Sequence, residues 1–250
     1  MPIKLIVTDI DGTLIDSPRC FAPSARNMEA LRRARDAGIT IAIASGRNLA
    51  SCTDFARQIG FSGPIICNNG AEVWEGEKCY SRHCMDNIII PFSLEFSRSH
   101  RLMPVIFSTM GLYIPDQGSD EANVATVDRL VKNDRVNYIQ PLGRPEHFAR
   151  LYKEGFSKIL FNAESDEAAW NARMDWESAV ARGELPPMEV TTSYFQSFEI
   201  NPDDANKGTG VRDLGKALGL TKDEIMAVGD NENDVGMFTE CEGSVVMDNA

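Results

Sequence analysis

The stretch Lys4-Leu5-Ile6-Val7-Thr8-Asp9-Ile10-Asp11-Gly12-Thr13 stands near the start of the chain. Its first half consists mainly of side chains that favour strands, so it predicts a buried strand over Lys4–Thr8 that ends at Asp9. Two carboxylates, a glycine and a threonine follow directly. Because ligands of parallel α/β sheets bind beyond the carboxyl ends of the strands, this loop is a candidate functional site.

The residues after this loop alternate between helical and strand patterns. Apolar residues recur at helical spacing over 24–38 and over 49–60, and a glycine closes each segment. Short apolar runs at Ile39–Ala44 and Pro64–Cys67 predict two more buried strands. Strands that alternate with helices of about ten to fifteen residues are typical of βαβ units. We therefore expect an α/β fold with a Rossmann-like parallel sheet.

The middle of the chain, from about Trp74 to Tyr194, has a different pattern. Prolines interrupt it often, and strands and helices alternate less regularly than in the first part. The residue patterns here predict a hairpin around Glu75-Gly76, helices over 124–132 and 166–180, and strands over 158–161 and 188–192.

The alternation of strand and helix returns in the last part of the chain. The patterns there predict helices over 207–218 and 232–240, strands over 225–228 and 244–247, and a capping box at 221–224. We therefore expect two domains, a core formed by 1–80 with 195–250 and an α+β unit inserted at 81–194.

Composition and charge exclude several classes of protein. Hydrophobic residues make up 43% and charged residues 25% of the 250-residue chain, as in soluble globular proteins. The apolar runs are too short for a membrane-spanning helix, and the N-terminus lacks the pattern of a signal peptide. The 25 basic and 37 acidic residues give a net charge of −12, which disfavours nucleic acid and anionic membranes as partners. We expect a cytoplasmic protein; its oligomeric state has no signal in the sequence.

The six cysteines and three histidines form no recognisable metal motif. No cysteine pair has C-x-x-C spacing, and no histidines have H-E-x-x-H pairing. A chain of this size does not depend on disulfide bonds, so we expect reduced thiols.

Four predicted strands end in polar loops. These loops contain Asp9 and Asp11, Ser45-Gly46-Arg47, Asn68-Asn69-Gly70, and the stretch from Gly229 to Asp234. If the strands are neighbours, the loops converge on one crevice and their four aspartates repel one another. Mg²⁺ relieves that repulsion, prefers oxygen ligands, and keeps positions for water or phosphate oxygens. The cluster therefore predicts both Mg²⁺ and a small anionic substrate.

Other ligand motifs do not fit. Counted from Asp9 or from Asp230, the chain lacks the glycine at position six and the glutamate at position twelve of an EF-hand loop. It also lacks a nucleotide-binding P-loop, and Gly208-Thr209-Gly210 is not followed by the third glycine of a dinucleotide site.

The polar loops resemble the motifs of the haloacid dehalogenase superfamily. The four resemblances, in the family's order, are Asp9-Ile10-Asp11-Gly12-Thr13, Ser45-Gly46-Arg47, Asn206-Lys207-Gly208 and Gly229-Asp230-x-x-Asn233-Asp234. Asn69-Gly70-Ala71 and the last part of the chain resemble the class IIB, Cof-type branch of sugar and metabolite phosphatases. In that branch a cap domain that selects the substrate is inserted between the second and third motifs.

The resemblance implies a phosphatase that uses Mg²⁺ to hydrolyse a small phosphorylated metabolite, such as a sugar phosphate. It implies Asp9 as the nucleophile that forms an aspartyl-phosphate, Asp11 as the general acid and base, and Lys207 as a charge partner of the phosphate. The implied Mg²⁺ ligands are Asp9, the backbone carbonyl of Asp11 and Asp230, with Asp234 nearby or bound through water.

The resemblance also implies a set of phosphate- and substrate-binding residues: Thr13, Ser45, Gly46, Arg47, Asn69 and Lys207. For Arg47 two interpretations stay open, because it fits either a substrate contact or a cap of its own loop. Candidates for contacts with the leaving group are Arg82, Arg144 and Lys158, and each of them also fits a solvated surface charge.

Two other functions stay open. A phosphomutase of the same fold also forms an aspartyl-phosphate, but it returns the phosphate to the sugar. A regulatory module binds phosphate without turnover, although an intact set of Asp9, Asp11, Lys207 and Asp230 favours an enzyme. Two features depart from the family: its members usually continue with a further strand and helix beyond the equivalent of Ala250, and the 201–205 segment before Lys207 is unusually acidic.

Overall fold

The structure is a computed structural model, and it describes residues 2–16, 22–109, 111–115, 139–142, 144–192 and 196–250. The chain divides into two compact units. Unit 1 comprises Met1–Arg82 and Ala205–Ala250, and unit 2 comprises His83–Asp204. The sequence patterns place the second boundary earlier, between 194 and 195. The difference arises from β11 (Ser197–Pro202), which pairs with strands of unit 2 on both of its sides.

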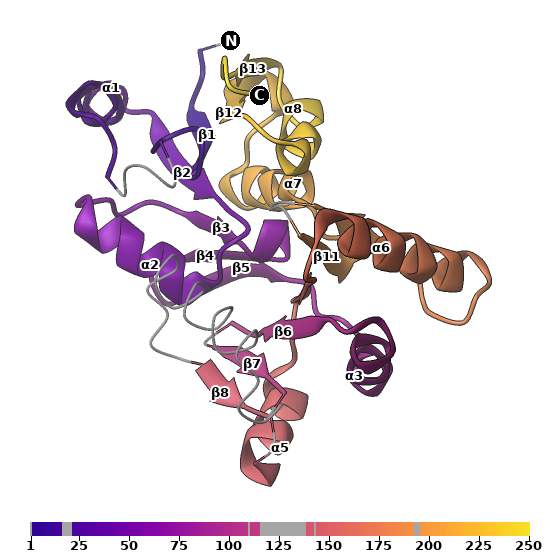
Figure 1. Cartoon of the computed structure of the whole chain (residues 1–250). Coiled ribbons are helices and arrows are strands. Elements are labelled where there is room, and N and C mark those ends of the chain that lie inside the picture. The colour runs from indigo at the N-terminus through magenta and orange to yellow at the C-terminus, as the bar shows by residue number, and fades with distance from the viewer. Residues whose placement is uncertain (1, 17–21, 110, 116–138, 143, 193–195) are drawn as a thin grey trace. The chain divides into compact units, whose positions relative to one another are not determined.

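Unit 1 contains a seven-stranded sheet (Figure 1). In spatial order its strands are β13 (Gly243–Val246), β12 (Ile225–Gly229), β1 (Leu5–Asp9), β2 (Thr40–Ala44), β3 (Ile65–Cys67), β4 (Glu72–Glu75) and β5 (Lys78–Arg82). The strands from β13 to β3 are parallel, whereas β4 and β5 form an antiparallel hairpin. The predicted α/β fold with a parallel sheet is confirmed.

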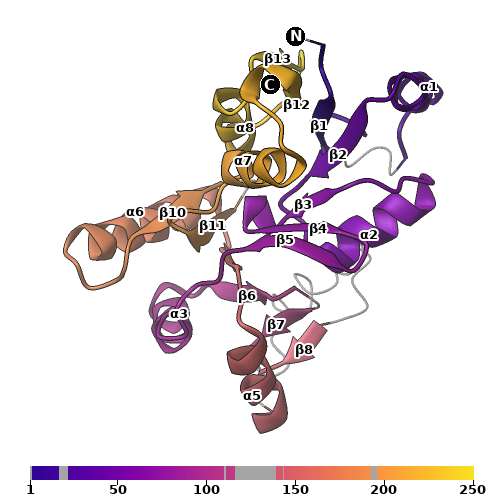
Figure 2. The same cartoon turned by 180° about the vertical axis from the view of Figure 1, so that it is seen from behind.

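Helices cover both faces of this sheet. They are α1 (Ala25–Asp36), α2 (Leu49–Gln58), α7 (Lys207–Leu218) and α8 (Val235–Thr239), with 3₁₀ turns η1 (Asn68–Gly70), η2 (Lys222–Glu224) and η3 (Glu232–Asp234). Val211 of α7 packs with Val7 of β1 on one face, where α7 lies beside α8 (Figures 1 and 2). Phe55 of α2 packs with Ile43 of β2 on the other face. Since helices bury both faces, the inner parallel strands β1, β2 and β3 consist mainly of apolar, buried residues.

The capping signals act as the sequence predicts at α1, where the Ser24 hydroxyl accepts a hydrogen bond from the backbone N–H of Asn27. Two other segments differ. The strand expected at 244–247 begins one residue earlier, and the helix expected at 232–240 begins with the 3₁₀ turn η3. Asp234 explains this turn, since its side chain accepts hydrogen bonds from two backbone N–H groups just before it and tightens the chain. The helix expected at 124–132 lies outside the described residues.

Unit 2 is an α+β unit with a six-stranded sheet. In spatial order the strands are β10 (Met188–Thr191), β11, β9 (Lys158–Asn162), β6 (Met103–Phe107), β7 (Leu112–Ile114) and β8 (Ile139–Pro141). All neighbours are antiparallel except β7 and β8. The described helices are α3 (Ile89–His100), α5 (Pro145–Glu154) and α6 (Asp166–Ala181).

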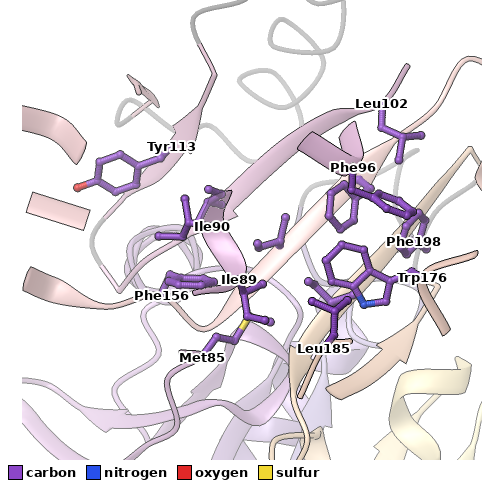
Figure 3. Packing of buried hydrophobic residues seen from close by; sticks show 14 of the residues in the cluster. Met85, Ile89, Ile90, Phe96, Leu102, Tyr113, Phe156, Trp176, Leu185 and Phe198 are labelled. Atoms are coloured by element: carbon purple, nitrogen blue, oxygen red, sulfur yellow. The ribbon is translucent and has the colours of Figure 1, made fainter. Parts of the chain in front are cut away.

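Aromatic side chains form the centre of unit 2 (Figure 3). Trp176 of α6 is fully buried, and its ring centroid lies 5.0 Å from that of Phe96 in α3 and 5.2 Å from that of Phe161 in β9. Phe161 in turn stacks on Phe198 of β11 at 4.9 Å. Aromatic rings at these distances stabilise a fold by more than the burial of their apolar surface alone. This cluster therefore joins two helices to the sheet.

The side chains of the first and last residues of unit 2 form a hydrogen bond with each other. His83 Nδ1 lies 2.9 Å from Asp204 Oδ2. The segment that leaves β5 of unit 1 and the segment that returns to it therefore run side by side at this point.

Two expectations from composition can be compared with the structure. In the described part of the chain, no helix is both long enough and apolar enough to cross a membrane. The described cysteines are Cys52, Cys67, Cys79, Cys84 and Cys241, and none of these five forms a disulfide bond.

Candidate active site

The loop after β1 begins at Asp9, the last residue of a buried strand. β1 lies between β12 and β2, so Asp9 stands at the centre of the parallel sheet, and this residue is only 4% exposed. Gly12 then turns the chain with φ of +87°. A Cβ atom on Gly12 would lie 2.1 Å from Asp230 Oδ2, so only glycine fits this backbone and this approach.

Three carboxylates converge at the ends of β1 and β12. Oxygen atoms of Asp9, Asp230 and Asp234 all lie within 4.8 Å of one another. Neighbouring residues fix Asp230: Thr13 Oγ1 donates to its Oδ1 at 2.6 Å, and Asn249 Nδ2 donates to its Oδ2 at 2.9 Å. The parallel pairing of β1 with β12 brings these loops together, as the sequence predicts for neighbouring strand ends.

Lys207 is the first residue of α7 and lies among these carboxylates. Its Nζ atom is 2.7 Å from Asp9 Oδ1 and 2.6 Å from Asp234 Oδ1, and its side chain is 1% exposed. Burial alone would lower the pKa of Lys207, but the negative charges of Asp9 and Asp234 outweigh it and raise that pKa. Lys207 is therefore a permanent positive charge beside Asp9. The Asn206 side chain caps α7 by accepting a hydrogen bond from the Thr209 N–H at 3.1 Å.

Asp9 has the opposite balance. The pKa of Asp9 is raised to about 7: burial is the largest cause, the charges of Asp234 and Asp11 add to it, and Lys207 acts against it. Because burial is the largest of these effects, the charge of Lys207 alone does not restore the usual pKa of Asp9. A second positive charge at the same place would favour the ionised form of Asp9.

Asp11 faces a different partner. Arg47 Nε donates to Asp11 Oδ2 at 2.8 Å, and Arg47 Nη2 donates to Asp11 Oδ1 at 2.6 Å. This is a two-pronged ion pair of the kind that guanidinium groups form with carboxylates and phosphates. The Arg47 side chain is 12% exposed and that of Asp11 22%, so the pair lies at the edge of the site. In this structure Arg47 thus contacts the Asp9–Thr13 loop.

Ser45 stands in the loop after β2, and Asn69 stands in the turn after β3. Ser45 is buried, its hydroxyl accepts a hydrogen bond from the Arg47 N–H at 3.2 Å, and Gly46 lies between these two residues. The Asn69 N–H donates to the Ser45 carbonyl at 3.1 Å. Asn69 Oδ1 accepts from Asn233 Nδ2 at 3.2 Å, and Asn233 Oδ1 accepts from Lys207 Nζ at 3.4 Å. The loops of all four motifs are thus connected by hydrogen bonds.

Comparison with known proteins tests the resemblance of the four motifs. The family described as haloacid dehalogenase-like hydrolase matches residues 6–250. The chain belongs to this family. A relative, the 5-amino-6-(5-phospho-D-ribitylamino)uracil phosphatase YcsE of Bacillus subtilis strain 168, is 24% identical over 249 residues, with 99% of this chain and 85% of the relative covered.

This haloacid dehalogenase-like hydrolase is also similar to a second phosphatase in sequence and to a solved structure in fold. A phosphoglycolate phosphatase of Methanoculleus marisnigri is 26% identical over 250 residues, with 99% of this chain and 85% of the relative covered. The crystal structure of a haloacid dehalogenase-like hydrolase from Bacteroides thetaiotaomicron has a TM-score of 0.81 at 24% identity, with 99% and 89% of the two chains covered. The predicted family and enzyme class, a phosphoric monoester hydrolase, are confirmed. The two relatives are named for different phosphorylated compounds.

The acidic cluster of this hydrolase fits a hard divalent cation. Its donors are carboxylate oxygens, which Mg²⁺ prefers, and they already lie within a few ångströms of one another. Burial raises the pKa of Asp9, so a cation bound at this place would favour its ionised form.

Several residues of the hydrolase site escape prediction from sequence. Asn233 stands inside the fourth motif, so its place in the motif was an available signal. Asn249, which contacts Asp230 and the Gly12 carbonyl, and Glu72, which is described below, have no such signal.

The three candidates for leaving-group contacts have different positions. Arg82 belongs to β5 of unit 1, where its Nε lies 3.7 Å from Glu72 Oε2. Arg144 is exposed just before α5. Lys158 is not a solvated surface charge: it is 3% exposed, its Nζ lies 3.2 Å from Glu199 Oε1, and it stands 4.1 Å from the centre of the Phe107 ring.

Proposed function

We propose that this hydrolase is a Mg²⁺-dependent phosphatase of a small phosphorylated metabolite, such as a sugar phosphate. The observation that carries the proposal is the position of Lys207 Nζ, which contacts both Asp9 and Asp234. A permanent positive charge beside a buried carboxylate suits attack on an anionic phosphate, because phosphoryl transfer depends mainly on positioning and on charge stabilisation.

Hydrolysis then proceeds by two transfers. In the first, an Asp9 carboxylate oxygen bonds to phosphorus, the bond from phosphorus to the ester oxygen breaks, and Asp11 gives its proton to the departing alcohol. In the second, Asp11 takes a proton from water, the water oxygen bonds to phosphorus, and the bond from phosphorus to Asp9 breaks. Inorganic phosphate leaves, and both side chains return to their initial state.

The surrounding residues bind the phosphate and orient these two carboxylates. Lys207 holds its charge beside the reacting oxygen of Asp9. The Ser45 hydroxyl and the Gly46 N–H would be donors for phosphate oxygens. The Thr13 hydroxyl donates to Asp230 in this structure, so Thr13 would bind phosphate only after releasing that carboxylate. Asn69 lines the site through its bond to Asn233.

Arg47 links phosphate binding to the state of Asp11. Because the guanidinium group contacts both Asp11 oxygens, this carboxyl group can exchange a proton with the substrate only after the ion pair has opened. An incoming phosphate competes for the same group, since guanidinium binds carboxylate and phosphate alike. The two interpretations of Arg47, substrate contact and loop partner, then describe two stages of one cycle.

Asp9, the Asp11 backbone carbonyl and Asp230 would hold Mg²⁺, which when bound stabilises negative charge on the phosphate oxygens. Asp234 Oδ1 accepts a hydrogen bond from Lys207, and Asp234 Oδ2 accepts from two backbone N–H groups. We therefore place Asp234 beside these ligands or linked through water. Unit 2 would select the substrate, because all four motifs belong to unit 1.

Phosphate release tests the proposal. Purified enzyme is incubated with p-nitrophenyl phosphate and a panel of phosphorylated metabolites, with Mg²⁺ or with a chelator, and inorganic phosphate is measured. We expect the enzyme to release phosphate when Mg²⁺ is present and not when the chelator is present. The rate of release should fall more than about a thousandfold in Asp9→Asn, because an amide neither attacks phosphorus nor ligates Mg²⁺ adequately.

The matched control is Asp54→Asn, at a half-buried aspartate of α2 that forms an ion pair with Arg57 at 2.8 Å, and it should keep full activity. An Asp9→Asn variant within tenfold of the parent would show that Asp9 is not the nucleophile. Transfer of phosphate to a second position of a sugar, without release, would indicate a phosphomutase. Phosphate binding without turnover of any substrate would indicate a regulatory module.

A further inference from the structure

We propose that Glu72 is a positioning residue for the phosphatase reaction, which it supports by holding the turn η1 against the Ser45–Arg47 loop. The inference rests on the proposed function. Glu72 stands in β4, and its side chain has no exposed surface. Burial of a carboxylate is costly unless hydrogen bonds compensate for the lost water, so the contacts of such a group indicate why it is there.

Two N–H donors meet the Glu72 carboxylate. Asn68 Nδ2 donates to Oε1 at 3.0 Å, and Trp74 Nε1 donates to Oε2 at 3.0 Å. Arg82 Nε lies 3.7 Å from Oε2, on the more exposed side. Asn68 is the first residue of η1, so the first of these contacts connects a buried charge of the sheet to the turn after β3.

The turn that Glu72 holds has an unusual backbone. Asn68 and Asn69 have φ of +49° and +54°, in the left-handed region that side-chain-bearing residues adopt at a cost. A Cβ atom on the next residue, Gly70, would lie 1.9 Å from the carbonyl oxygen of Asn206, just before Lys207. The bond from the Asn68 side chain to Glu72 therefore ties this left-handed turn to β4, next to the place where Gly70 lies against the residue before α7.

The turn η1 also forms hydrogen bonds with other loops of the site. The Asn68 N–H donates to the Arg47 carbonyl at 2.8 Å, and the Asn69 N–H donates to the Ser45 carbonyl at 3.1 Å. Asn69 also reaches Lys207 through Asn233. A shift of η1 would therefore move Ser45 and the Arg47 backbone together, although the described contacts of Glu72 are with Asn68, Trp74 and Arg82.

The test separates position from stability. Glu72→Leu removes both acceptors, and Glu72→Gln keeps the shape but turns an NH₂ group toward one of the two donors. We expect kcat/KM for p-nitrophenyl phosphate to fall by about tenfold to a hundredfold in Glu72→Leu and by less in Glu72→Gln, well below their melting temperatures. The control is Glu224→Gln: Glu224 is a buried carboxylate of unit 1 whose described partners are Lys4 and Thr221. It should lose stability and keep kcat/KM.

A second variant gives a rescue. Trp74→Phe removes the donor that faces the NH₂ group of Glu72→Gln, so in the double variant the remaining oxygen can accept from Asn68. We expect Glu72→Gln with Trp74→Phe to recover the kcat/KM of Trp74→Phe alone, and Glu72→Leu with Trp74→Phe to stay low. A merely structural role would not produce this recovery.

Hydrogen exchange of the peptide that contains η1 gives a readout without turnover. It should accelerate in Glu72→Leu and not in Glu224→Gln. Unchanged kcat/KM in Glu72→Leu, absence of rescue, or unchanged exchange would each overturn the role of Glu72. If the parent enzyme hydrolysed no phosphate ester, the proposed function would fail, while the exchange comparison would still test the contact from Glu72 to η1.

Discussion

Asp9 and Asp11 are two residues apart, yet their surroundings differ. Asp9 is buried against Lys207, whereas Asp11 lies at the edge of the site in an ion pair with Arg47. Enzymes that use two carboxylates commonly assign them different roles through such differences in environment. A nucleophile needs a fixed position and a nearby positive charge, and a general acid needs room to take and release a proton.

Asp11→Asn tests the second role. The amide cannot carry the proton, so kcat should fall by about a hundredfold or more, a common contribution of general acid–base catalysis. Affinity for Mg²⁺, measured by titration against the melting temperature, should change little, because the backbone carbonyl is the ligand that we assign to Asp11. Loss of Mg²⁺ affinity in parallel with kcat would make the Asp11 carboxylate the ligand.

At the scale of elements, the turn after β1 depends on one glycine. Gly12 combines a left-handed backbone with a close approach to Asp230. Gly38, which follows α1, has a similar φ of +82°, but a Cβ atom there would meet nothing within 4 Å. A comparison of alanine substitutions at these two glycines therefore distinguishes the cost of the left-handed backbone from the cost of steric crowding.

Gly12→Ala should both destabilise the protein and displace the Asp230 carboxylate. We expect a loss of about 1–3 kcal/mol in the free energy of unfolding and a loss of activity of about a hundredfold or more. Gly38→Ala should show only the cost of the left-handed backbone, with full activity. Urea unfolding and phosphate release measure the two effects, and normal kcat/KM in Gly12→Ala would contradict the assigned place of Asp230.

The elements that could be predicted from sequence are those with local signals. The Ser24 cap, the glycine after α7 and the apolar runs of the parallel strands each act within a few residues. The end of the insertion could not be found in this way, because the strand pattern of β11 does not say which sheet it joins. Only its pairing with β9 and β10 does.

The same distinction applies to the site. Asp9 and Asp230 each follow a predicted strand, so the sequence predicts that they meet if the two strands are neighbours. Lys207 could be assigned to the site only through the resemblance of Asn206-Lys207-Gly208 to the family's third motif. Asn249 acts on Gly12 across 237 positions of the sequence, and no local pattern indicates such a contact. From sequence alone, Lys158 has the pattern of an exposed charge. Its buried partner Glu199 stands 41 positions later, so no local pattern indicates the pair.

For the whole molecule, the balance of charge predicts how ligands act on stability. Without a cation, the carboxylates of unit 1 repel one another and a phosphate anion. Mg²⁺ should therefore raise the melting temperature, and inorganic phosphate should raise it further only when Mg²⁺ is present. Binding at a hundred times Kd gives about 2.7 kcal/mol, a shift of several degrees for a chain of this size.

The measurement is a melting series with chelator, Mg²⁺ alone, phosphate alone and both. Asp9→Asn should lose most of the response to Mg²⁺, and Asp54→Asn should keep it. Equal stabilisation by phosphate in chelator would show that the cation does not create the anion site, contrary to our interpretation of the acidic cluster.

The thiols report burial across both units. Cys79 and Cys84 are exposed, whereas Cys52, Cys67 and Cys241 are buried, and burial raises the pKa of Cys241 to about 11. Since the thiolate is the reactive form, a raised pKa slows alkylation. Among the five described cysteines, iodoacetamide at pH 8 should label Cys79 and Cys84 first, and Cys241 more than about a hundredfold more slowly until denaturant is added. Peptide mass spectrometry measures the order, and rapid labelling of Cys241 in native protein would contradict it.

The bond between His83 and Asp204 has a consequence for how the chain finds its fold. A flexible loop between β5 and α7 would cost conformational entropy to close, and that cost grows with the length of the loop. An insertion whose two ends are fixed together by its own folding behaves instead as a short tether. Contacts between β5 and α7 then become local in effect, and local contacts form faster than distant ones. We expect the inserted unit, once folded, to act as a template that brings the two halves of its host within reach of each other.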